Sequence, residues 1–358
     1  MIDHARDHPS FYAANMEHHD TIVIGAGPIG LETAAGLLAH EHSTLVLDSG
    51  PIGSTIATLF PPATRFFSSP DRLEIAGIRC PTFAEEKANR EEYLAYLRGV
   101  VDTLSIPVRT FHTVRDARAT PSGFELEVAE RSGRGRRFSA RTLVLATGGM
   151  GRTRALGIEG ETLPHVRHDL GDPHQYHGRR VLIVGGRNSA CEAAIRCWRA
   201  GADVHLSHRG PEVNERVKYW IRPELLALIE EGRITAYPES VPARIDREQV
   251  TLHSLSGEAP IPLEVDDILL MIGYEHDPQL MRQLDLPLDP VTLAPTFDER
   301  TMETSVPGLY VAGTATAGTQ DRFRVYIENC HVHAQRIASA ITGTDGTTIS
   351  EHRRLEES

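Results

Sequence analysis

The sequence has few cysteines. Among its 358 residues there are four, and no two of them are spaced as CxxC: Cys80, Cys191, Cys197 and Cys330. Disulfide-stapled secreted folds, zinc ribbons and dithiol redox motifs all need more thiols or closer ones. The cysteine pattern therefore excludes these three classes of protein.

An excess of positive charge is also absent. The chain has 37 Lys and Arg against 49 Asp and Glu, which gives a net charge of −12. Proteins that bind nucleic acid neutralise phosphates with basic side chains, so this balance argues against a nucleic-acid partner. Long apolar runs are absent as well, and residues 1–19 are polar and His-rich. We therefore expect no signal peptide, no membrane partner, a poorly ordered tail over 1–19 and a cytoplasmic location.

What is present is an ordinary globular composition, with 40% hydrophobic and 24% charged residues. At about 150 residues per domain, the length predicts two or three domains with cores of their own. The chain also alternates between short β-branched runs, typical of buried strands, and segments with helical spacing of apolar residues. This alternation indicates an α/β fold.

The first nucleotide-binding pattern is a Gly-rich turn. Residues 25–30 read GAGPIG, a full GxGxxG, between an expected strand at 21–24 and a helix. In such turns the glycines allow a sharp bend, close approach of a pyrophosphate and packing of helix on strand. Asp48 ends the next expected strand 23 residues after Gly25, where an acceptor for a ribose hydroxyl is expected. The pattern predicts a dinucleotide site.

The same pattern recurs about 160 residues later. Strands are expected at 180–184 and 203–207, on either side of a helix at 188–200. The turn between them, residues 185–190, reads GGRNSA, so Arg187 replaces the middle glycine. One recurrence at this distance is too long and too isolated for a solenoid. It predicts a second dinucleotide-binding domain.

The two patterns differ at the strand end that faces the ribose. The second pattern has His208 and Arg209 where the first has Asp48. Cationic side chains there accommodate a 2′-phosphate, although a solvated strand end is the alternative. Arg216 and Lys218 are further candidates. We therefore predict NADPH in the second domain and FAD in the first, a pair that allows hydride transfer from nicotinamide to flavin.

Two later segments make the chain resemble the low-molecular-weight thioredoxin reductase-like flavoproteins. Residues 143–149 (LVLATGG) are similar to the strand that precedes the crossover into their NADPH domain, and residues 308–314 (GLYVAGT) are similar to their closing FAD strand. The resemblance implies an α/β fold with two Rossmann-like dinucleotide-binding domains, the NADPH domain being inserted in a discontinuous FAD domain. The expected bounds are 20–155 and 296–358 for the FAD-binding domain and 156–295 for the NADPH-binding domain.

Within that superfamily the chain resembles the bacillithiol disulfide reductases. The similar segments are 65–69 (RFFSS), 72–75 (RLEI), 185–190 (GGRNSA), 217–220 (VKYW), 301–304 (TMET) and 327–329 (IEN). That family usually has Lys where Arg187 stands, so a cation in the second turn is a trait of the family. The resemblance implies FAD, NADPH, a homodimer and reduction of a low-molecular-weight thiol disulfide.

The chain departs from this family at the residue that carries the redox role. The family typically has a cysteine after the proline of the first turn, whereas this chain has Ile29. Thiol–disulfide exchange needs a thiolate, which isoleucine does not supply. Asp48 is also shorter than the usual Glu, and Thr314 stands where related enzymes often have Asp. These two changes weaken individual FAD contacts.

Cys330 is the candidate that takes over the redox role. By the resemblance, the helix start that carries it approaches the flavin ring, where a helix dipole lowers the pKa of a thiol. The nearby His331 and His333 are candidates for a base or proton donor, and the alternative is that the pair flanks opposite sides of a helix without a chemical role. Cys330 also fits one apolar helical stripe with Ile327, Ala334 and Ile337, and this spacing favours a packing role over redox chemistry.

The predicted FAD contacts are Gly25, Gly27, Pro28, Ile29, Gly30, Asp48, Ser49, Ser54, Thr147, Gly148, Gly313 and Thr314. The predicted NADPH contacts are Gly185, Arg187, Asn188, Ser189, His208, Arg209 and Arg216. The candidate catalytic residues are Cys330 and His331, and no metal site is predicted.

The sequence thus predicts an FAD-dependent NADPH oxidoreductase that passes hydride from NADPH to FAD and on to a small-molecule disulfide of the bacillithiol type. Two alternatives stay open. Without a redox cysteine, the flavin passes electrons to ferredoxin, quinone or oxygen. Alternatively, the chain is a non-catalytic protein that binds NADPH and FAD and senses the redox state.

Overall fold

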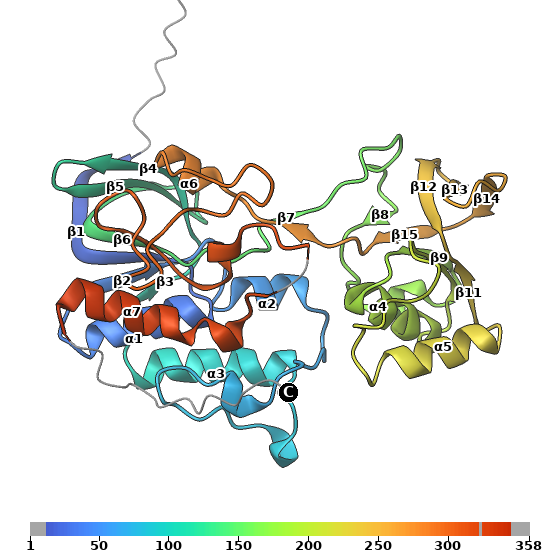
Figure 1. Cartoon of the computed structure of the whole chain (residues 1–358), viewed down its shortest axis with the longest axis horizontal. Helices are drawn as coiled ribbons and strands as arrows, with labels where there is room; N and C mark the ends of the chain where they lie inside the picture. Colours follow the sequence, from blue (N-terminus) through green and yellow to red (C-terminus); the bar gives the residue numbers. More distant parts are fainter. Residues whose placement is uncertain (1–11, 322–323, 345–358) are drawn as a thin grey trace, which may run out of the picture. The chain divides into compact units, whose positions relative to one another are not determined.

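Two compact units make up the chain, and they are described separately (Figure 1). The structure is a computed structural model that describes residues 12–321 and 324–344. Unit 1 comprises Met1–Arg152 and Glu275–Ser358, and unit 2 comprises Thr153–Tyr274. No helix among the described residues is long and apolar enough to cross a membrane.

Unit 1 is built on a seven-stranded sheet in the order β3-β2-β1-β6-β5-β4, with β17 also pairing with β6. The strands β3, β2, β1, β6 and β17 pair in parallel, whereas β4, β5 and β6 form an antiparallel meander. The bounds are β1 Tyr12–Ile24, β2 Thr44–Leu47, β3 Val108–Arg109, β4 His112–Thr120, β5 Gly123–Glu130, β6 Gly135–Leu145 and β17 Leu309–Val311.

The sheet begins earlier in the chain than expected. Residues 12–19, predicted to belong to a poorly ordered tail, are part of β1, so that prediction was wrong for this stretch. The reason is that β6 is a long strand that begins at Gly135, well before its central part. Its first half offers backbone partners, and residues 16–19 pair with 137–140 in register. Residues 1–11 lie outside the described residues.

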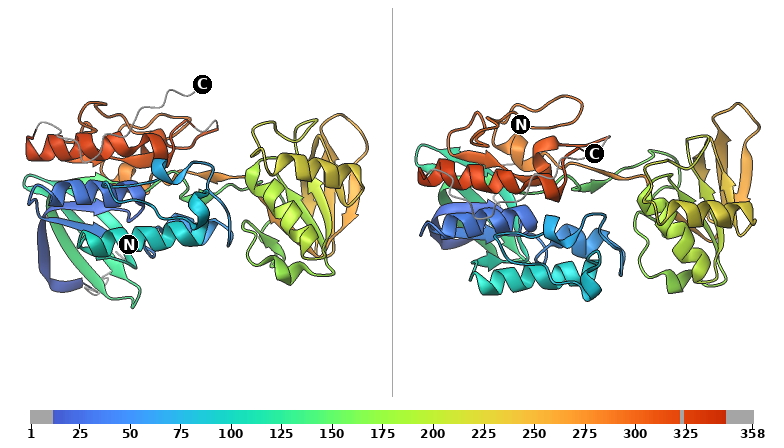
Figure 2. Two further views of the ribbon diagram at one scale, coloured as in Figure 1. Left: turned by 90° about the horizontal axis from the view of Figure 1, so that it is seen from below. Right: turned by 60° about the horizontal axis from the view of Figure 1, so that its bottom comes forward.

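Three long helices of unit 1 pack on one face of this sheet, with α1 between α7 and α3 (Figures 1 and 2). Val23 of β1 faces these helices, while its neighbours Ile22 and Ile24 point into a second core on the opposite face. The helices of unit 1 are α1 Pro28–Leu38, α2 Ser54–Leu59, α3 Arg90–Thr103, α6 Gln279–Gln283 and α7 His331–Thr342, with short 3₁₀ turns η1 Pro70–Arg72, η2 Phe83–Glu85, η4 Gly313–Ala317 and η5 Ile327–Asn329.

Unit 2 repeats the parallel pattern on a smaller scale. Its five-stranded sheet has the order β11-β10-β9-β15-β8, and a three-stranded antiparallel sheet has the order β12-β13-β14. The strands are β8 Val166–Arg167, β9 Arg180–Val184, β10 Asp203–Ser207, β11 Ile234–Tyr237, β12 Ser240–Ile245, β13 Gln249–Ser254, β14 Ile261–Glu264 and β15 Asp267–Leu270. The helical segments are η3 Pro173–Tyr176, α4 Asn188–Arg199 and α5 Arg222–Glu230.

The chain passes between the units twice, through β7 (Arg152–Thr153) and β16 (Tyr274–Glu275), which pair with each other. The second passage differs from the expected domain boundary, because residues 275–295 fall in unit 1 rather than in the second domain. The physical reason is packing: Met281 of α6, with Leu284 after it, is buried in the core that faces β1 and β6.

Candidate functional site

The first Gly-rich turn joins β1 to α1 and contacts the residues at the end of β6. Gly25 has a φ of +116°, and a Cβ there would lie 2.3 Å from the carbonyl oxygen of Ala146. A Cβ on Gly30 would lie 2.0 Å from the Gly25 carbonyl oxygen, so α1 packs directly on the turn. Gly27 differs, because nothing lies within 4 Å of the Cβ position there. Gly27 therefore leaves open space at the start of α1, where a phosphate group fits the helix N-terminus.

Asp48 holds this turn through its carboxylate. Its Oδ2 accepts a hydrogen bond from the Ala26 N–H (2.7 Å), and its Oδ1 accepts one from the Gly50 N–H (2.8 Å). Burial raises the pKa of Asp48, and the two backbone hydrogen bonds partly offset this effect. Ser54 lies close by at the start of α2, while Ser49 is exposed. The structure thus brings the predicted ribose acceptor directly beside the phosphate turn.

The ends of β6 and β17 meet beside the same turn. The Gly149 N–H donates to the Thr314 hydroxyl (3.0 Å), which links the segment after β6 to the segment after β17. A Cβ on Gly313 would lie 3.4 Å from the Cβ of Ile29. The predicted FAD contacts therefore lie in one region of unit 1, although they come from three parts of the sequence. These parts are the turn at 25–30, Thr147 with Gly148, and Gly313 with Thr314.

This region fits FAD. The N-terminus of α1 is open to a pyrophosphate, and the buried carboxylate of Asp48 is an acceptor for a ribose hydroxyl. The glycines that follow β6 and β17 allow the cofactor to come close to the backbone. Bound FAD supplies the electron chemistry, and the protein supplies position and electrostatics. The individual FAD contacts remain predictions.

All four cysteines are buried, Cys330 completely. Burial raises the pKa of the Cys330 thiol to about 12, with the charges of Glu328 and Glu32 adding to the effect. The pKa values of the other three thiols are likewise raised to about 12, mainly by burial. Although Cys330 precedes α7, the helix dipole does not make it a thiolate, so its surroundings favour the packing role.

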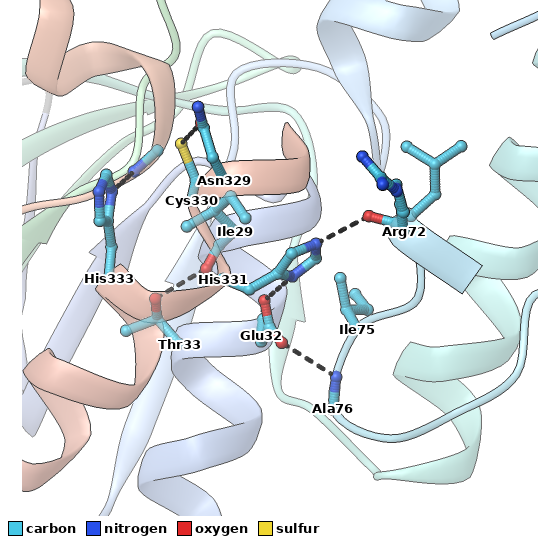
Figure 3. Close-up of polar contacts among 12 residues, drawn as sticks. Ile29, Glu32, Thr33, Arg72, Ile75, Ala76, Asn329, Cys330, His331 and His333 are labelled. Carbon is cyan, nitrogen blue, oxygen red and sulfur yellow. Dashed lines mark hydrogen bonds and ion pairs between the residues drawn. The ribbon is translucent and has the colours of Figure 1, made fainter. Parts of the chain in front are cut away.

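His331, the candidate base, is enclosed by hydrogen-bond partners (Figure 3). Its Nδ1 lies 2.7 Å from Oε2 of Glu32, and its Nε2 lies 3.0 Å from the carbonyl oxygen of Arg72. Both side chains of this ion pair are 7% exposed. Both ring nitrogens are engaged. His331 is therefore placed to keep a proton and to tie segments of the fold together, rather than to accept a proton from a substrate.

Unit 2 contains the second turn, between β9 and α4. Gly185 has a φ of +139°, and a Cβ there would lie 2.5 Å from the Met271 carbonyl oxygen. Arg187 is exposed at the start of α4, and Oδ1 of Asn188 accepts a hydrogen bond from the Lys218 N–H (2.8 Å). The loop that carries Arg216 and Lys218 is thereby tied to the predicted phosphate turn.

The two residues at the end of β10 have different environments. Arg209 is exposed, as a contact with a phosphate requires. His208 is only 5% exposed, and burial lowers its pKa despite a backbone hydrogen bond to Gly210. Burial therefore works against the positive charge expected of His208, and its contact with the nucleotide stays a prediction. Arg209, Arg187 and Arg216 remain the cationic candidates.

Two buried side chains next to these segments, Glu32 and His276, were not predicted from the sequence, whereas the half-buried His333 was a candidate base. Glu32 pairs with His331, His333 accepts a hydrogen bond from the Gly313 N–H (3.2 Å), and His276 lies 3.2 Å from the Gly148 carbonyl oxygen. Glu32 could have been found from the sequence, because it is an acidic residue among the apolar residues of α1. Nothing in the local sequence marks His276, because its partner is 128 residues away.

Comparison with known proteins gives a consistent result. The model of the pyridine nucleotide-disulphide oxidoreductase family matches residues 22–313. The bacilliredoxin reductase of Bacillus subtilis (strain 168) is 32% identical over 327 residues, which is 91% of this chain and 98% of that protein. The structure of a bacillithiol disulfide reductase from Bacillus cereus has 30% identity and a TM-score of 0.86, and the match covers 91% of this chain and 99% of that one.

A more distant relative has a different named activity. The ferredoxin–NADP reductase of Ignicoccus hospitalis is 25% identical over 304 residues, which is 83% of this chain and 90% of that protein. The likeness therefore extends across reductases whose names refer to different electron acceptors.

Proposed function

We propose that this chain, which belongs to the pyridine nucleotide-disulphide oxidoreductase family, reduces a low-molecular-weight thiol disulfide of the bacillithiol type with electrons from NADPH. It is an FAD-dependent oxidoreductase that uses a nicotinamide nucleotide, with the two-domain α/β fold of its relatives. The observation that carries the choice of substrate is the likeness to the bacilliredoxin reductase and the bacillithiol disulfide reductase over nearly their whole lengths.

In this proposal each unit holds one cofactor. Unit 1 holds FAD between the first Gly-rich turn, Asp48 and the ends of β6 and β17. Unit 2 holds NADPH at the second turn, where Arg187, Arg209 and Arg216 surround the 2′-phosphate. The acid of unit 1 and the arginines of unit 2 support this assignment, because a carboxylate favours a ribose hydroxyl and repels a phosphate.

The electrons reach the disulfide without a thiol of this chain. Ile29 stands where related reductases have a redox cysteine, and the four thiols are buried with pKa values raised to about 12. At neutral pH such thiols are almost completely protonated, and a protonated thiol does not attack a disulfide. The proposed reaction takes a disulfide, two electrons and two protons to two thiols. FAD held by the first Gly-rich turn and Asp48 would supply the redox chemistry, and NADPH would supply the electrons.

The same observation favours a second candidate function. An enzyme with no reactive thiol is suited to deliver electrons to ferredoxin, quinone or oxygen, and relatives named ferredoxin–NADP reductase match over most of the chain. The non-catalytic alternative has less support, since the family model is that of an oxidoreductase. The homodimer and the cytoplasmic location expected from the sequence remain predictions, and light scattering of the purified holoenzyme tests the former.

An acceptor screen tests the proposal. Purified holoenzyme is mixed anaerobically with NADPH, and oxidation of the nicotinamide is followed after addition of bacillithiol disulfide, ferredoxin or a quinone, with oxygen measured separately. We expect turnover with bacillithiol disulfide well above the rate without an acceptor. Turnover with ferredoxin or quinone alone would favour the second candidate. A flavin that stays oxidised after addition of NADPH would contradict both.

A further inference from the structure

The start of α7 is held on two opposite sides by two histidines, His331 and His333 (Figure 3). His331 faces Glu32 of α1, the helix that begins at the first Gly-rich turn. His333 faces Gly313, which follows β17. These two segments are the ones that approach FAD in the proposed function. The first turn of α7 therefore bridges the two walls of the proposed flavin site.

The hydrogen bonds assign opposite protonation states to the two rings. His331 has an acceptor at each nitrogen, the Glu32 carboxylate at 2.7 Å and the Arg72 carbonyl at 3.0 Å, so both nitrogens carry a proton. His333 accepts the Gly313 N–H at Nδ1, so that nitrogen carries none. Burial, with the nearby charges of Arg336 and His331, lowers the pKa of His333 to about 4, and this ring is neutral at physiological pH.

The Glu32–His331 pair also ties in a third segment. The Ala76 N–H approaches the other oxygen of Glu32 (3.3 Å), and the Arg72 carbonyl belongs to the same loop. A buried ion pair with its remaining hydrogen-bonding positions filled is specific in geometry, and removal of one charge leaves the other unpaired. Loss of the proton from His331 would break one of its two hydrogen bonds and leave the carboxylate of Glu32 buried without a counter-charge.

We propose that His331 is a positioning residue for FAD, and that the retention of FAD depends on the proton that His331 holds. Protonated His331 fixes α7 to α1, and His333 on the same helix turn fixes Gly313. The sheet sets the spacing of β1 and β17 through β6, and the buried proton on His331 fixes where α7 and the loop of Arg72 and Ala76 lie against α1. This inference rests on the FAD site proposed for unit 1.

The charges around His331 determine the direction of the pH effect. Burial alone lowers the pKa of His331, but the hydrogen bond and charge of Glu32, the Arg72 carbonyl and the charge of Glu328 together raise it above its usual value. The other titratable groups nearby are Cys330, His333 and Arg336 on α7 or at its start and Tyr93 on α3. Because FAD binds the form of the protein in which His331 holds its proton, FAD binding is complete below the raised pKa and weakens as the pH rises above it.

The test is the release of FAD from the holoenzyme as a function of pH. Holoenzyme is diluted into buffers from pH 6 to 10, and the fluorescence of released flavin gives the dissociation constant. For the wild type we expect a constant affinity on the acidic side and a loss approaching tenfold per pH unit across the window set by His331. For His331→Gln, which keeps side-chain hydrogen bonding but not the charge, we expect FAD held about tenfold less tightly and no pH-dependent step. Glu32→Gln should behave alike, and the double variant should be no worse than either single one.

A matched control is Glu125→Gln, which removes the half-buried partner of the exposed Arg118 on the β4–β5 hairpin of the same unit. It should keep the wild-type affinity and pH profile. The proposal is overturned if His331→Gln binds FAD with the wild-type affinity and pH dependence. If that variant does not fold, the wild type decides, since a flat profile across the window also overturns the proposal. A wild-type protein that binds no FAD at any pH would instead contradict the proposed function.

Discussion

At the scale of single residues, the burial of the thiols has the largest consequence for mechanism. Cys330 is completely buried, and with a pKa of about 12 its thiolate fraction at neutral pH is on the order of 10⁻⁵. The helical stripe in the sequence indicated this packing role, but a position before a helix also suggested dipole activation. The outcome depends mainly on burial, with Glu328 and Glu32 adding to it, and both effects are visible only in the folded chain.

We predict that Cys330→Ala keeps turnover of the disulfide acceptor within about twofold of the wild type, while the free energy of unfolding falls by about 1 kcal/mol because a small cavity forms. NADPH oxidation and urea unfolding measure the two effects. Cys197→Ala in unit 2 is the matched buried control. A loss of turnover of a hundredfold or more, with FAD still bound, would restore Cys330 as the redox residue.

The glycines of the first turn differ in what a methyl group would meet. At Gly27 it enters open space with the backbone at an ordinary φ of −78°, whereas at Gly25 it would collide with the Ala146 carbonyl at a φ of +116°. We predict that Gly27→Ala leaves the stability of the FAD-free protein unchanged but weakens FAD binding about tenfold, because the methyl group occupies the approach of the phosphate.

The matched variant is Gly25→Ala, which should lower the free energy of unfolding by roughly 2–4 kcal/mol through the collision and the positive φ. Urea unfolding and flavin fluorescence separate the two effects. Wild-type FAD affinity in Gly27→Ala would show that the phosphate does not approach this turn.

At the scale of elements, the strand–turn–helix of unit 2 is the proposed determinant of which nicotinamide nucleotide is used. We predict that Arg209→Ala raises KM for NADPH at least tenfold and leaves KM for NADH unchanged, because a charge-assisted hydrogen bond to the 2′-phosphate contributes about 1.5–3 kcal/mol. Steady-state kinetics with both nucleotides measure this. Arg244→Ala on β12, an exposed arginine beside Asp246, is the control. An equal effect of Arg209→Ala on both nucleotides would place this side chain away from the 2′-phosphate.

The sequence predicts most of these elements because their periodicity is local. The strands β9 and β10 have the expected bounds, and α1 and α4 follow the two turns as expected. It does not predict the strand at 12–19, since this strand arises from pairing with residues more than a hundred positions away. The lowered pKa of His208 has the same kind of cause, because neighbouring elements bury this side chain.

At the scale of the whole molecule, each unit has cores of its own. Unit 1 has two cores, one on each face of the large sheet, and Val23 lies in one and Phe124 in the other. Unit 2 also has two cores, which contain Leu206 and Val250 respectively. Domains with separate cores fold with considerable independence. The sequence repeat indicated two such domains, but the packing of residues 275–295 places more of the chain in unit 1 than expected.

Excision of unit 2 therefore provides a test of how the two cofactors are divided. The Gly151 N–H donates to the Glu275 carbonyl oxygen (2.9 Å), so the two ends that remain after removal of residues 153–274 are adjacent, and a short Gly/Ser linker joins them with little loss of loop entropy. We predict that the shortened protein binds FAD, that a chemical reductant such as dithionite bleaches this FAD anaerobically, and that NADPH does not. The intact chain, bleached by both, is the control. Bleaching of the shortened protein by NADPH would place the nicotinamide nucleotide in unit 1, and the division of cofactors argued from Asp48 and Arg209 would be wrong.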